Sequence, residues 1–283
     1  MSLQPRNKPL GHFVKKDNEL TKAHFYDMSV TAYRIILLAS SDKFLEQIKR
    51  NPLETIRITP ADYHDVFGTG GDTSPSYRAL KDSTKELLEA TLWFRNIKQS
   101  GDAGTWSGGI NWLQMAKYND TIKALEIRFS IDIVPLILDV QKNYTYYNLR
   151  HISKLSSMHS IRLYELMMFW RKKGSTPPLS VGYMRTWLGV ADGKYPEMKD
   201  FNKHIIKKSA TEITDKSDIA LDYEPQKEKR SVVGYVFSYT PKLAQVNEGG
   251  EDESFDQGKE EADFPPPLPK IEGEDDQDVE LPF

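Results

Sequence analysis

Residues 201–239 read FNKHIIKKSATEITDKSDIALDYEPQKEKRSVVGYVFSY, and this stretch decides the fold. In its first part, apolar residues recur at the spacing of one face of a helix. That helix is predicted to begin upstream, at about Pro196, and to end near Thr214. Two alternating runs follow, SDIALDYE and SVVGYVFSY, with the loop PQKEKR between them. Side chains alternate along a strand, so four residues of the second run are expected to share one face: Val233, Tyr235, Phe237 and Tyr239.

Two further helices are predicted upstream of this stretch. LSSMHSIRLYELMMFWRKKG (155–174) has the length of a long helix that ends at Gly174, and LSVGYMRTWLG (179–189) predicts a short one. Three helices closed by a β-hairpin form a winged helix, a helix-turn-helix variant whose third helix can enter the major groove of DNA.

The same order of elements is predicted in the first half of the chain. Helices are expected at residues 28–41, at 58–68 and from Ser74 to about residue 90. The third of these should point four residues inward: Tyr77, Leu80, Leu87 and Leu88. The β-rich runs after it are TLWFRNI (91–97), TWSGGINWLQMA (105–116) and ALEIRFSI (124–131).

The amino-acid sequences of the two halves also show weak similarity. SVTAYRIILL (29–38) matches SMHSIRLYEL (157–166), and ITPADYHDVFG (58–68) matches LSVGYMRTWLG. The first half has seven more residues between these segments, which we assign to a loop around residues 43–52. The predicted fold class is therefore α+β, with two tandem winged-helix domains. Its predicted parts are an N-terminal arm (1–22), a first domain (23–141), a second domain (142–241) and a disordered acidic tail (242–283).

Charge is distributed unevenly along this chain of 283 residues. Residues 247–283 hold 14 acidic and 2 basic residues, a net charge of −12, which leaves 36 basic and 27 acidic residues, a net of +9, in residues 1–246. A basic body indicates a polyanionic partner. The absence of cysteine excludes disulfides and thiolate metal sites, no apolar run has the length of a membrane span, and a cytoplasmic protein without membrane contact is expected.

The third helix of the second domain carries an unusually basic face. Opposite its apolar side lie two rows at i, i+4 spacing: Lys203, Lys207 and Thr211, and beside them Asp200, His204 and Lys208. A helix face in water usually alternates acidic and basic residues, so the lysine row favours a DNA partner over a merely solvated face, the alternative reading. Three further cations lie at the predicted hairpin tip, where a wing would meet phosphates: Lys227, Lys229 and Arg230.

The first domain offers a weaker basic face. Its third helix exposes Arg78, Lys81 and Lys85, but Asp82, Glu86 and Glu89 lie among them. We expect phosphate contacts there that position the protein, and a β-region that is left available for dimerisation.

The stretch from Leu155 to Tyr239, including SIRLYELMMFW, MRTWLGV and the quoted helix and hairpin, resembles the second winged-helix domain of iteron-binding plasmid replication initiator (Rep) proteins. VKKDNELTKAHFYDMSVTAYRIILLA resembles the start of that family's first domain, so the resemblance covers about residues 14–241. It implies a protein that binds origin iterons as a monomer, assists origin opening, recruits host replication proteins and represses its own promoter as a dimer. The family's recognition helix commonly reads Phe-x-Arg-Arg-Val-Ile, where this chain has Lys203 and His204, so the iteron sequence does not carry over.

The tail ends in DDQDVELPF, with apolar residues only at the tip. This ending is similar to the C-terminal tip of bacterial single-stranded DNA-binding proteins, and the resemblance implies that Leu281, Pro282 and Phe283 dock on host replication proteins. Three alternatives stay open: a solubilising tail, a DNA mimic that folds back on the basic helix, and a degenerate sliding-clamp peptide.

Enzyme classes are disfavoured by the motifs that the chain lacks. The six histidines include no His-hydrophobic-His pair for a nickase, and there is no phosphate-binding loop of the Gly-x-x-x-x-Gly-Lys-Ser/Thr type. We therefore expect no catalytic residues, no metal and no cofactor, and interpret Tyr144, Tyr146 and Tyr147 as packing between the domains. The alternative function is a winged-helix transcriptional repressor without initiator activity.

Overall fold

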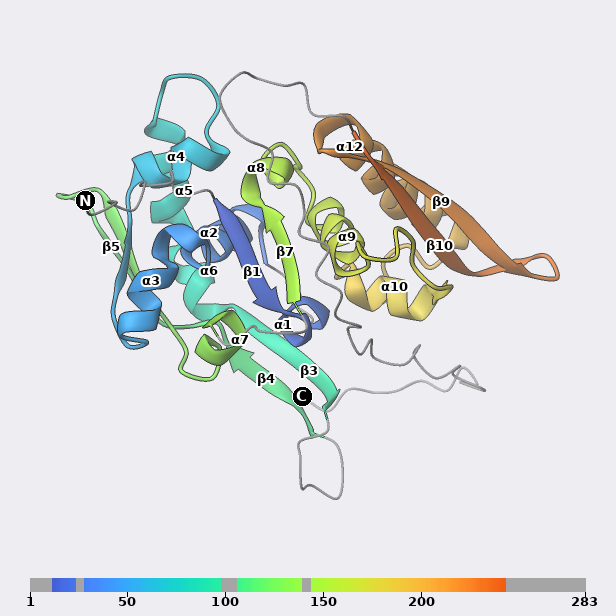
Figure 1. The fold of residues 1–283 in the computed structure, drawn as a ribbon, viewed down its shortest axis with the longest axis horizontal. Coiled ribbons are helices and arrows are strands. Elements are labelled where there is room, and N and C mark those ends of the chain that lie inside the picture. Colours follow the sequence, from blue (N-terminus) through green and yellow to red (C-terminus); the bar gives the residue numbers. More distant parts are fainter. Residues whose placement is uncertain (1–11, 24–27, 98–105, 139–143, 243–283) are drawn as a thin grey trace, which may run out of the picture. The chain divides into compact units, whose positions relative to one another are not determined.

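The computed structural model describes residues 12–23, 28–97, 106–138 and 144–242 (Figure 1). The described residues belong to one compact unit. Apart from Lys242, the predicted tail lies outside the described residues. Among the helices that are described, none has the length and apolar character that a bilayer crossing requires.

The first domain is a winged helix built on α2, α4 and α5 with the hairpin β5–β6. Its helices are α2 (Val30–Ala39), α3 (Asp42–Arg50), α4 (Pro60–Phe67), α5 (Ser74–Asp82), α6 (Thr84–Glu89) and α7 (Val134–Leu138). Its strands are β2 (Ile56–Ile58), β3 (Thr91–Ile97), β4 (Trp106–Asn111), β5 (Leu113–Asn119) and β6 (Ala124–Phe129). One antiparallel sheet has the order β2-β6-β5, and β3 and β4 pair as a separate hairpin. Thr59 caps α4, since Thr59 and Asp62 hydrogen-bond reciprocally as a capping box.

Three expectations for this domain were wrong. The segment assigned to a loop around residues 43–52 is largely the helix α3, which buries Phe44 and Ile48 at i, i+4 spacing. The third helix is interrupted at Ser83, which ends α5 and precedes α6, and Leu88 is 39% exposed and does not face inward. The run 105–116 is two strands, because the buried Trp112 separates β4 from β5.

The second domain has the predicted order of helices and strands. Its helices are α8 (Leu149–Ile152), α9 (Met158–Phe169), α10 (Val181–Trp187) and a continuous run of α11 (Met198–Phe201), η1 (Asn202–Lys207) and α12 (Lys208–Lys216). Its strands are β8 (Leu179–Ser180), β9 (Ile219–Glu228) and β10 (Ser231–Pro241), in the sheet order β8-β10-β9. The long helix ends at Phe169 and not at Gly174, which has a left-handed φ of 69° in the turn that follows.

A short N-terminal segment joins the two domains. Strand β1 (Phe13–Asp17) pairs antiparallel with β7 (Tyr144–Asn148), and helix α1 (Asn18–Lys22) follows β1. In Figure 1 the two strands lie side by side, with α9 beyond β7. Residues 13–22 thus contact parts of the chain that are more than 120 residues away.

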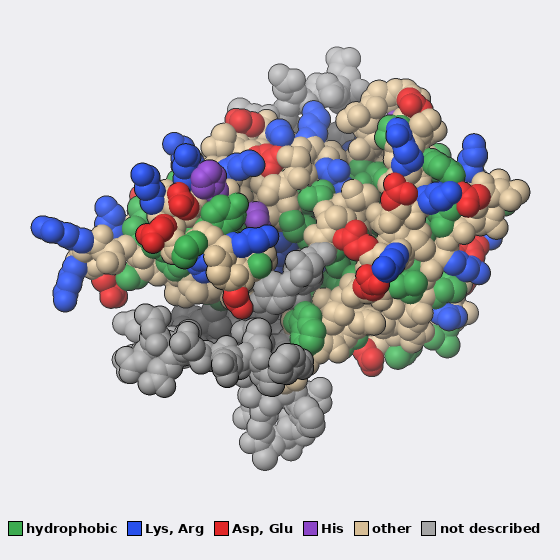
Figure 2. Space-filling model, turned by 180° about the vertical axis from the view of Figure 1, so that it is seen from behind, with side chains coloured by type: hydrophobic (Ala, Val, Ile, Leu, Met, Phe, Trp, Pro, Cys, Tyr) green, Lys and Arg blue, Asp and Glu red, His purple; other side chains and the backbone are tan. Residues whose placement is uncertain are grey.

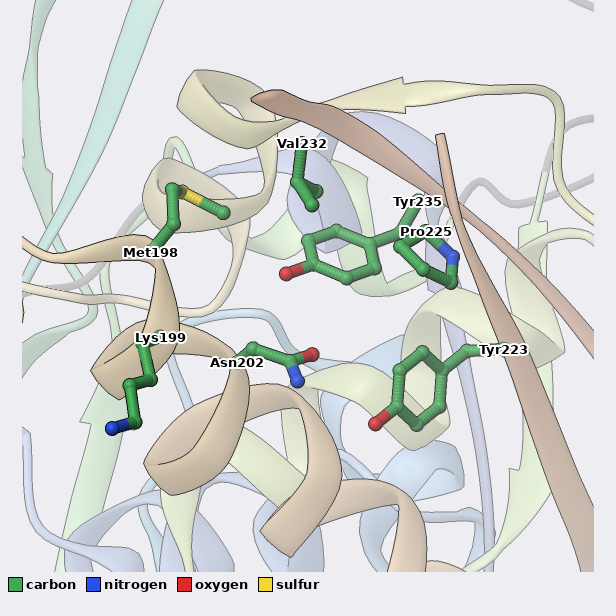
Figure 3. Close-up of a pocket in the computed structure, with 7 residues that line it drawn as sticks. All are labelled: Met198, Lys199, Asn202, Tyr223, Pro225, Val232 and Tyr235. Atoms are coloured by element: carbon green, nitrogen blue, oxygen red, sulfur yellow. The ribbon is translucent and has the colours of Figure 1, made fainter. Parts of the chain in front are cut away.

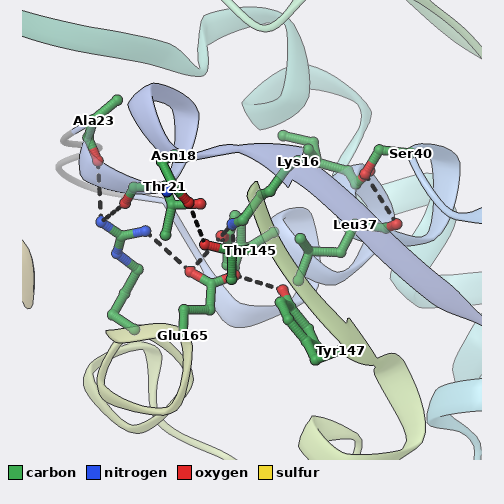
Figure 4. A network of polar contacts seen from close by, with 12 residues as sticks. Lys16, Asn18, Thr21, Ala23, Leu37, Ser40, Thr145, Tyr147 and Glu165 are labelled. Carbon is green, nitrogen blue, oxygen red and sulfur yellow. Dashed lines mark hydrogen bonds and ion pairs between the residues drawn. The ribbon is translucent and has the colours of Figure 1, made fainter. Parts of the chain in front are cut away.

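The buried carboxylate of Glu165 on α9 accepts hydrogen bonds from residues of this segment and of both domains, and so forms the centre of a polar network (Figure 4). Glu165 accepts hydrogen bonds from Lys16 Nζ at 2.6 Å, Tyr33 Oη at 2.7 Å and Tyr147 Oη at 2.5 Å. Arg162 Nη1 donates to the same carboxylate at 3.0 Å, while its Nη2 donates to the carbonyls of Thr21 and Ala23. The donors to Glu165 come from β1, α2, β7 and α9, so every element must be in place for the carboxylate to be satisfied. Of the tyrosines interpreted as packing between the domains, Tyr147 is buried in this network, whereas Tyr144 is 37% exposed.

The charges inside this network are mutually stabilised. Burial lowers the pKa of Lys16 to about 8, although the Glu165 carboxylate opposes this shift. Burial by itself would raise the pKa of Glu165, but the positive charges of Lys16 and Arg162 hold it below its usual value. The carboxylate is therefore ionised at neutral pH despite complete burial.

Candidate nucleic-acid interface

The helix from Met198 to Lys216, called the recognition helix below, packs one face on the second domain and exposes the other. The apolar residues that have helical spacing in the sequence face inward, with Met198 half-buried and the rest buried: Phe201, Ile205, Ile206, Ala210 and Ile213. The predicted outward residues are also exposed: Lys203, His204, Lys207, Lys208 and Thr211. Local sequence spacing therefore sufficed to orient this helix.

The middle of the recognition helix is a π-helix, which sequence spacing did not predict. Residues Asn202–Lys207 form this wider segment between the α-helical turns α11 and α12. π segments are rare and often occur at functional sites. The wider turn places the adjacent Ile205 and Ile206 both in the core, so that Lys203 and His204 precede them, and Lys207 and Lys208 follow them, on the exposed side.

Asp200 lies in the same rows as the exposed basic residues of this helix, but it forms no ion pair with them. Within the described ranges, no ion pair involves Lys203, His204, Lys207 or Lys208. Figure 2 shows lysine, arginine and histidine side chains gathered over the second domain, on the left of that view. Uncompensated cations on an exposed helix suit a phosphate backbone, because binding releases condensed counterions.

The hairpin β9–β10 forms the wing of the second domain. Glu228 pairs with Ser231, so Lys229 and Arg230 make the two-residue turn, with Lys229 at a left-handed φ of 55°. Lys227, Lys229 and Arg230 are all exposed, as predicted. None of the three makes an ion pair with another described residue.

A bulge in β10 corrects one prediction for the wing. The register shifts between Val232 and Gly234, so Val233 leaves the face of Tyr235 and Phe237 and is 38% exposed. Glycine is required at 234 because a Cβ there would lie 2.4 Å from the Leu179 carbonyl oxygen of β8. The alternation of residue types alone does not reveal a bulge.

Glu212 ties the recognition helix to the start of α9. Its carboxylate accepts hydrogen bonds from the backbone N–H of Ser156 at 2.8 Å, and from the hydroxyls of Ser156 at 2.7 Å and Ser160 at 2.6 Å. Lys216 adds an ion pair at 2.9 Å. Burial would raise the pKa of Glu212, but these hydrogen bonds outweigh it and lower the pKa to about 2.

The Glu212 anchor predicts an acid-dependent loss of stability. A carboxylate whose folded pKa lies below its unfolded value of 4.5 contributes stability that is complete above pH 4.5 and disappears as the pH falls toward 2. We expect the Glu212→Gln variant to be less stable than the wild type at pH 6, with the difference shrinking between pH 4.5 and pH 2. Urea unfolding at pH 6, 4 and 3 measures this, and a difference that stays constant with pH would contradict the assigned pKa.

A cluster of residues that precedes the recognition helix in the chain was not predicted from the sequence. Tyr195 has a left-handed φ of 51°, and its ring stacks on the exposed His204 at 5.7 Å between centroids, with 23° between the planes. Arg185 of α10 donates to the carbonyls of Lys194 and Tyr195 and lies 4.7 Å from the Phe201 ring. The residue before a proline is normally extended, so nothing in the sequence predicted this conformation. A strained backbone beside exposed cations is typical of a functional site.

The basic face of the first domain is largely neutralised, as predicted. Lys81 forms an ion pair with Asp120 of the β5–β6 turn at 2.6 Å, and Lys85 lies 3.8 Å from Glu89. Arg78 is exposed and makes no ion pair with another residue of the described chain. The predicted docking residues Leu281, Pro282 and Phe283 lie outside the described residues.

Comparisons with known proteins agree with this architecture. The family described as "Initiator Replication protein, WH1" matches residues 13–168, and "Initiator Rep protein, WH2" matches residues 180–239. A "Replication initiation protein" of Escherichia coli is 24% identical over 214 residues, which are 74% of this chain and 64% of that protein. An "Uncharacterized 27.6 kDa protein" of Escherichia coli is 25% identical over 169 residues, 57% of this chain and 68% of that protein.

A solved structure shares the fold. The crystal structure of Pi initiator protein in complex with iteron DNA superposes with a TM-score of 0.66 at 20% sequence identity, covering 83% of this chain and all of that one. The chain spans about two thirds of the length of the first of its curated relatives, at 64%. Two family matches in tandem cover most of the chain: the WH1 match runs from β1 into α9, and the WH2 match covers α10, the recognition helix and the wing. The chain therefore belongs to the family of initiator replication proteins, with a WH1 domain followed by a WH2 domain.

Proposed function

We propose that this protein is a plasmid replication initiator that binds the repeated iterons of an origin as a monomer and assists opening of the origin in the cytoplasm. Double-stranded DNA would lie against the recognition helix and the wing of the second domain. Family membership supports the initiator role, and the similar Pi initiator structure contains iteron DNA. No catalytic step is assigned to the chain.

One observation carries the assignment to the second domain. The recognition helix exposes four basic residues together: Lys203, His204, Lys207 and Lys208. In the first domain, by contrast, Lys81 pairs with Asp120 and Lys85 with Glu89. In this proposal Lys203 and His204 reach base edges, the wing cations contact phosphates, and Thr211 lies at the margin of the interface. Arg78, Lys81 and Lys85 contribute weaker phosphate contacts that position the first domain.

Selection of duplexes from a random DNA library tests the proposed function. We expect one enriched asymmetric motif, bound at one protein per site, because a monomer presents one recognition helix of this kind. Enrichment of no motif, with binding that only weakens as the salt concentration rises, would make the basic face a nonspecific phosphate surface and overturn the proposal. Transcriptional repression without initiation is the second candidate, and a plasmid carrying the selected motif should replicate only if the chain is an initiator.

Tyr195 is expected to position His204 for DNA contact. Asparagine tolerates left-handed backbone, so Tyr195→Asn should leave the free energy of unfolding unchanged or higher while removing the stacked ring. We expect about fivefold weaker binding to the selected duplex, or about 1 kcal/mol. Tyr195→Phe retains the ring and should bind as the wild type does. In a His204→Ala background the Tyr195→Asn effect should disappear, and full additivity of the two changes would contradict a role through His204.

The proposed homodimer, which would repress the promoter, uses the WH1 domain. Strands β3 and β4 pair with each other and with no third described strand, and Trp93 of β3 is 47% exposed. An exposed tryptophan on an unpaired sheet edge favours an interface between copies. Trp93→Glu should weaken dimerisation at least about tenfold in sedimentation velocity. Leu53→Glu, at a residue that is 53% exposed outside this hairpin, is the control and should leave dimerisation unchanged.

Recruitment of host replication proteins stays a prediction for the tail. Leu281, Pro282 and Phe283 are proposed as the docking peptide, on the basis of their resemblance to the tip of single-stranded DNA-binding proteins. Deletion of these three residues should abolish binding to host enzymes that recognise that tip while leaving DNA binding intact. Unchanged binding to all such enzymes would remove the docking role.

A further inference from the structure

His159 lies in the first turn of α9, next to the recognition helix. Ser156 and Ser160, which flank it in the chain, donate from their hydroxyls to the Glu212 carboxylate of that helix at 2.7 Å and 2.6 Å. Lys208 precedes Glu212 by one helical turn and is exposed. The two serine bonds therefore hold the start of α9 against the part of the recognition helix that carries Lys208.

One ring nitrogen of His159 is fixed and the other is accessible. Nδ1 donates a hydrogen bond to the Leu188 carbonyl at 2.6 Å, since a carbonyl oxygen can only accept. The ring is half-buried, but its Nε2 atom makes no hydrogen bond to another described residue and is not enclosed by the protein. With Nδ1 already carrying a proton, Nε2 is the atom at which the ring takes up a second one.

Two lysines place positive charge around this ring. Lys194, in the loop after α10, and Lys208 are both exposed and form no ion pair with another described residue. Burial lowers the pKa of His159 below its ordinary value of 6.5, and the charges of Lys194 and Lys208 lower it further, although the bond to Leu188 opposes them. The ring is therefore mostly neutral at pH 7 while no anion is present.

Other charged groups on the surrounding elements are already bound. Glu212 accepts from two serines and Lys216, and with a pKa of about 2 it stays ionised throughout the neutral range. Arg162 of α9 pairs with Glu165, and Arg185 of α10 donates to the carbonyls of the loop after it. No carboxylate of these elements neutralises the two lysines, so the cluster favours an added anion, and a phosphate offers oxygens for charge-assisted hydrogen bonds.

A pocket at the start of the recognition helix is a poorer place for a phosphate. It has a volume of about 410 Å³ and lies between that helix and the wing (Figure 3). Only Lys199 is charged among its lining residues, and Met198, Pro225 and Val232 contribute apolar wall. An anion would lose hydration there with little compensation.

We propose that His159, Lys194 and Lys208 bind one phosphate of the DNA backbone, and that His159 takes up a proton from solvent as this phosphate arrives. Nε2 gains the proton and donates it in a hydrogen bond to a phosphate oxygen, while Nδ1 keeps its bond to Leu188. The inference rests on the proposed function, because DNA must first lie on the recognition helix. It adds a contact from α9 and makes DNA binding depend on pH. A group that is neutral in the free protein and charged in the complex makes binding tighter as the pH falls.

The test uses the full chain and the duplex selected from the random library, at constant ionic strength. For the wild type, the dissociation constant should fall by about fivefold between pH 8 and pH 6. His159→Asn keeps an N–H that can reach the Leu188 carbonyl but has no group that titrates in this range. This variant should bind within about twofold of the wild type at pH 8 and should lose the fivefold gain at pH 6. Because His204 also titrates, the comparison is repeated in a His204→Gln background, where replacement of His159 should remove the same factor.

His64→Asn is the matched control, since both ring nitrogens of His64 already have partners, the Gly70 carbonyl at 2.9 Å and the Ser76 hydroxyl at 3.4 Å. It should leave the pH dependence unchanged. A second arm needs no protein variant: uncharged methylphosphonate groups replace the phosphates of the duplex one at a time, and one position should remove the pH dependence of the wild type.

A pH dependence that survives His159→Asn, or one that no single methylphosphonate removes, would overturn the phosphate site while leaving the proposed function intact. A dissociation constant of the wild type that does not change between pH 8 and pH 6 would overturn it as well. Absence of any selected duplex would instead overturn the proposed function.

Discussion

Replacement of Glu165 by alanine is expected to lower the free energy of unfolding by about 3–5 kcal/mol. The side chains of Lys16 and Glu165 are 2% and 0% exposed, and Arg162 is equally buried. Without the carboxylate, two buried cations lose their counter-charge and the hydroxyls of Tyr33 and Tyr147 lose their acceptor. The loss should exceed that of an ordinary cavity, because unpaired buried charge adds to it.

Urea unfolding followed by tryptophan fluorescence measures this loss. Glu126→Ala is a matched control, since Glu126 also faces two cations, Arg57 and Lys117, but those side chains are 60% and 63% exposed. A surface ion-pair group of this kind contributes only about 0–1 kcal/mol. Equal losses in the two variants would show that burial of the Glu165 network does not strengthen its contribution.

The double replacement Lys203→Ala, Lys207→Ala is expected to weaken binding to the selected duplex by about 2 kcal/mol, or about 30-fold. Both side chains are exposed on the recognition helix and make no ion pair with another described residue, so stability should change by no more than about 0.5 kcal/mol. The enriched motif should be lost from a repeated selection. The slope of log affinity against log salt concentration should fall by about 1 for each phosphate contact removed.

A control variant must distinguish the effect of these two positions from the effect of a lower net charge. Lys49 and Lys172 are exposed lysines outside the recognition helix, and their joint replacement by alanine removes the same charge, although Lys49 also loses its ion pair with Glu46. That variant should keep the motif and bind within about twofold of the wild type. If both double variants bind equally weakly, the basic face acts only through its general field and does not read sequence.

Sequence reasoning succeeded where the determinant is local. The recognition helix was oriented correctly because Phe201, Ile205 and Ile213 recur at helical spacing, whatever lies on the far side of them. The hairpin was predicted from alternation, but the expected loop of residues 225–230 was too long, because β9 extends to Glu228 and only Lys229 and Arg230 form the turn. Caps such as Thr59 with Asp62 are also local, since both partners lie within one turn.

The errors arose where tertiary contacts override local preference. Val233 leaves its expected face because β10 bulges where Gly234 approaches Leu179 of β8. Leu88 is 39% exposed on α6, the short helix that begins after the interruption at Ser83. The strained Tyr195 requires Arg185, ten residues away in sequence, to hold its carbonyl.

The sequence by itself determined the fold class, the tandem arrangement and the exposed cations of the recognition helix, since periodicity and charge act over one or two turns. Only the tertiary structure decided which cations form no ion pair with other described residues, that the Tyr195 ring stacks on His204, and that donors from four elements reach the Glu165 carboxylate. Lys16 and Glu165 are separated by 149 residues, and no spacing rule connects them. Such contacts depend on how whole elements pack, because the cost of burying a charge is offset only when a distant partner arrives at hydrogen-bonding distance.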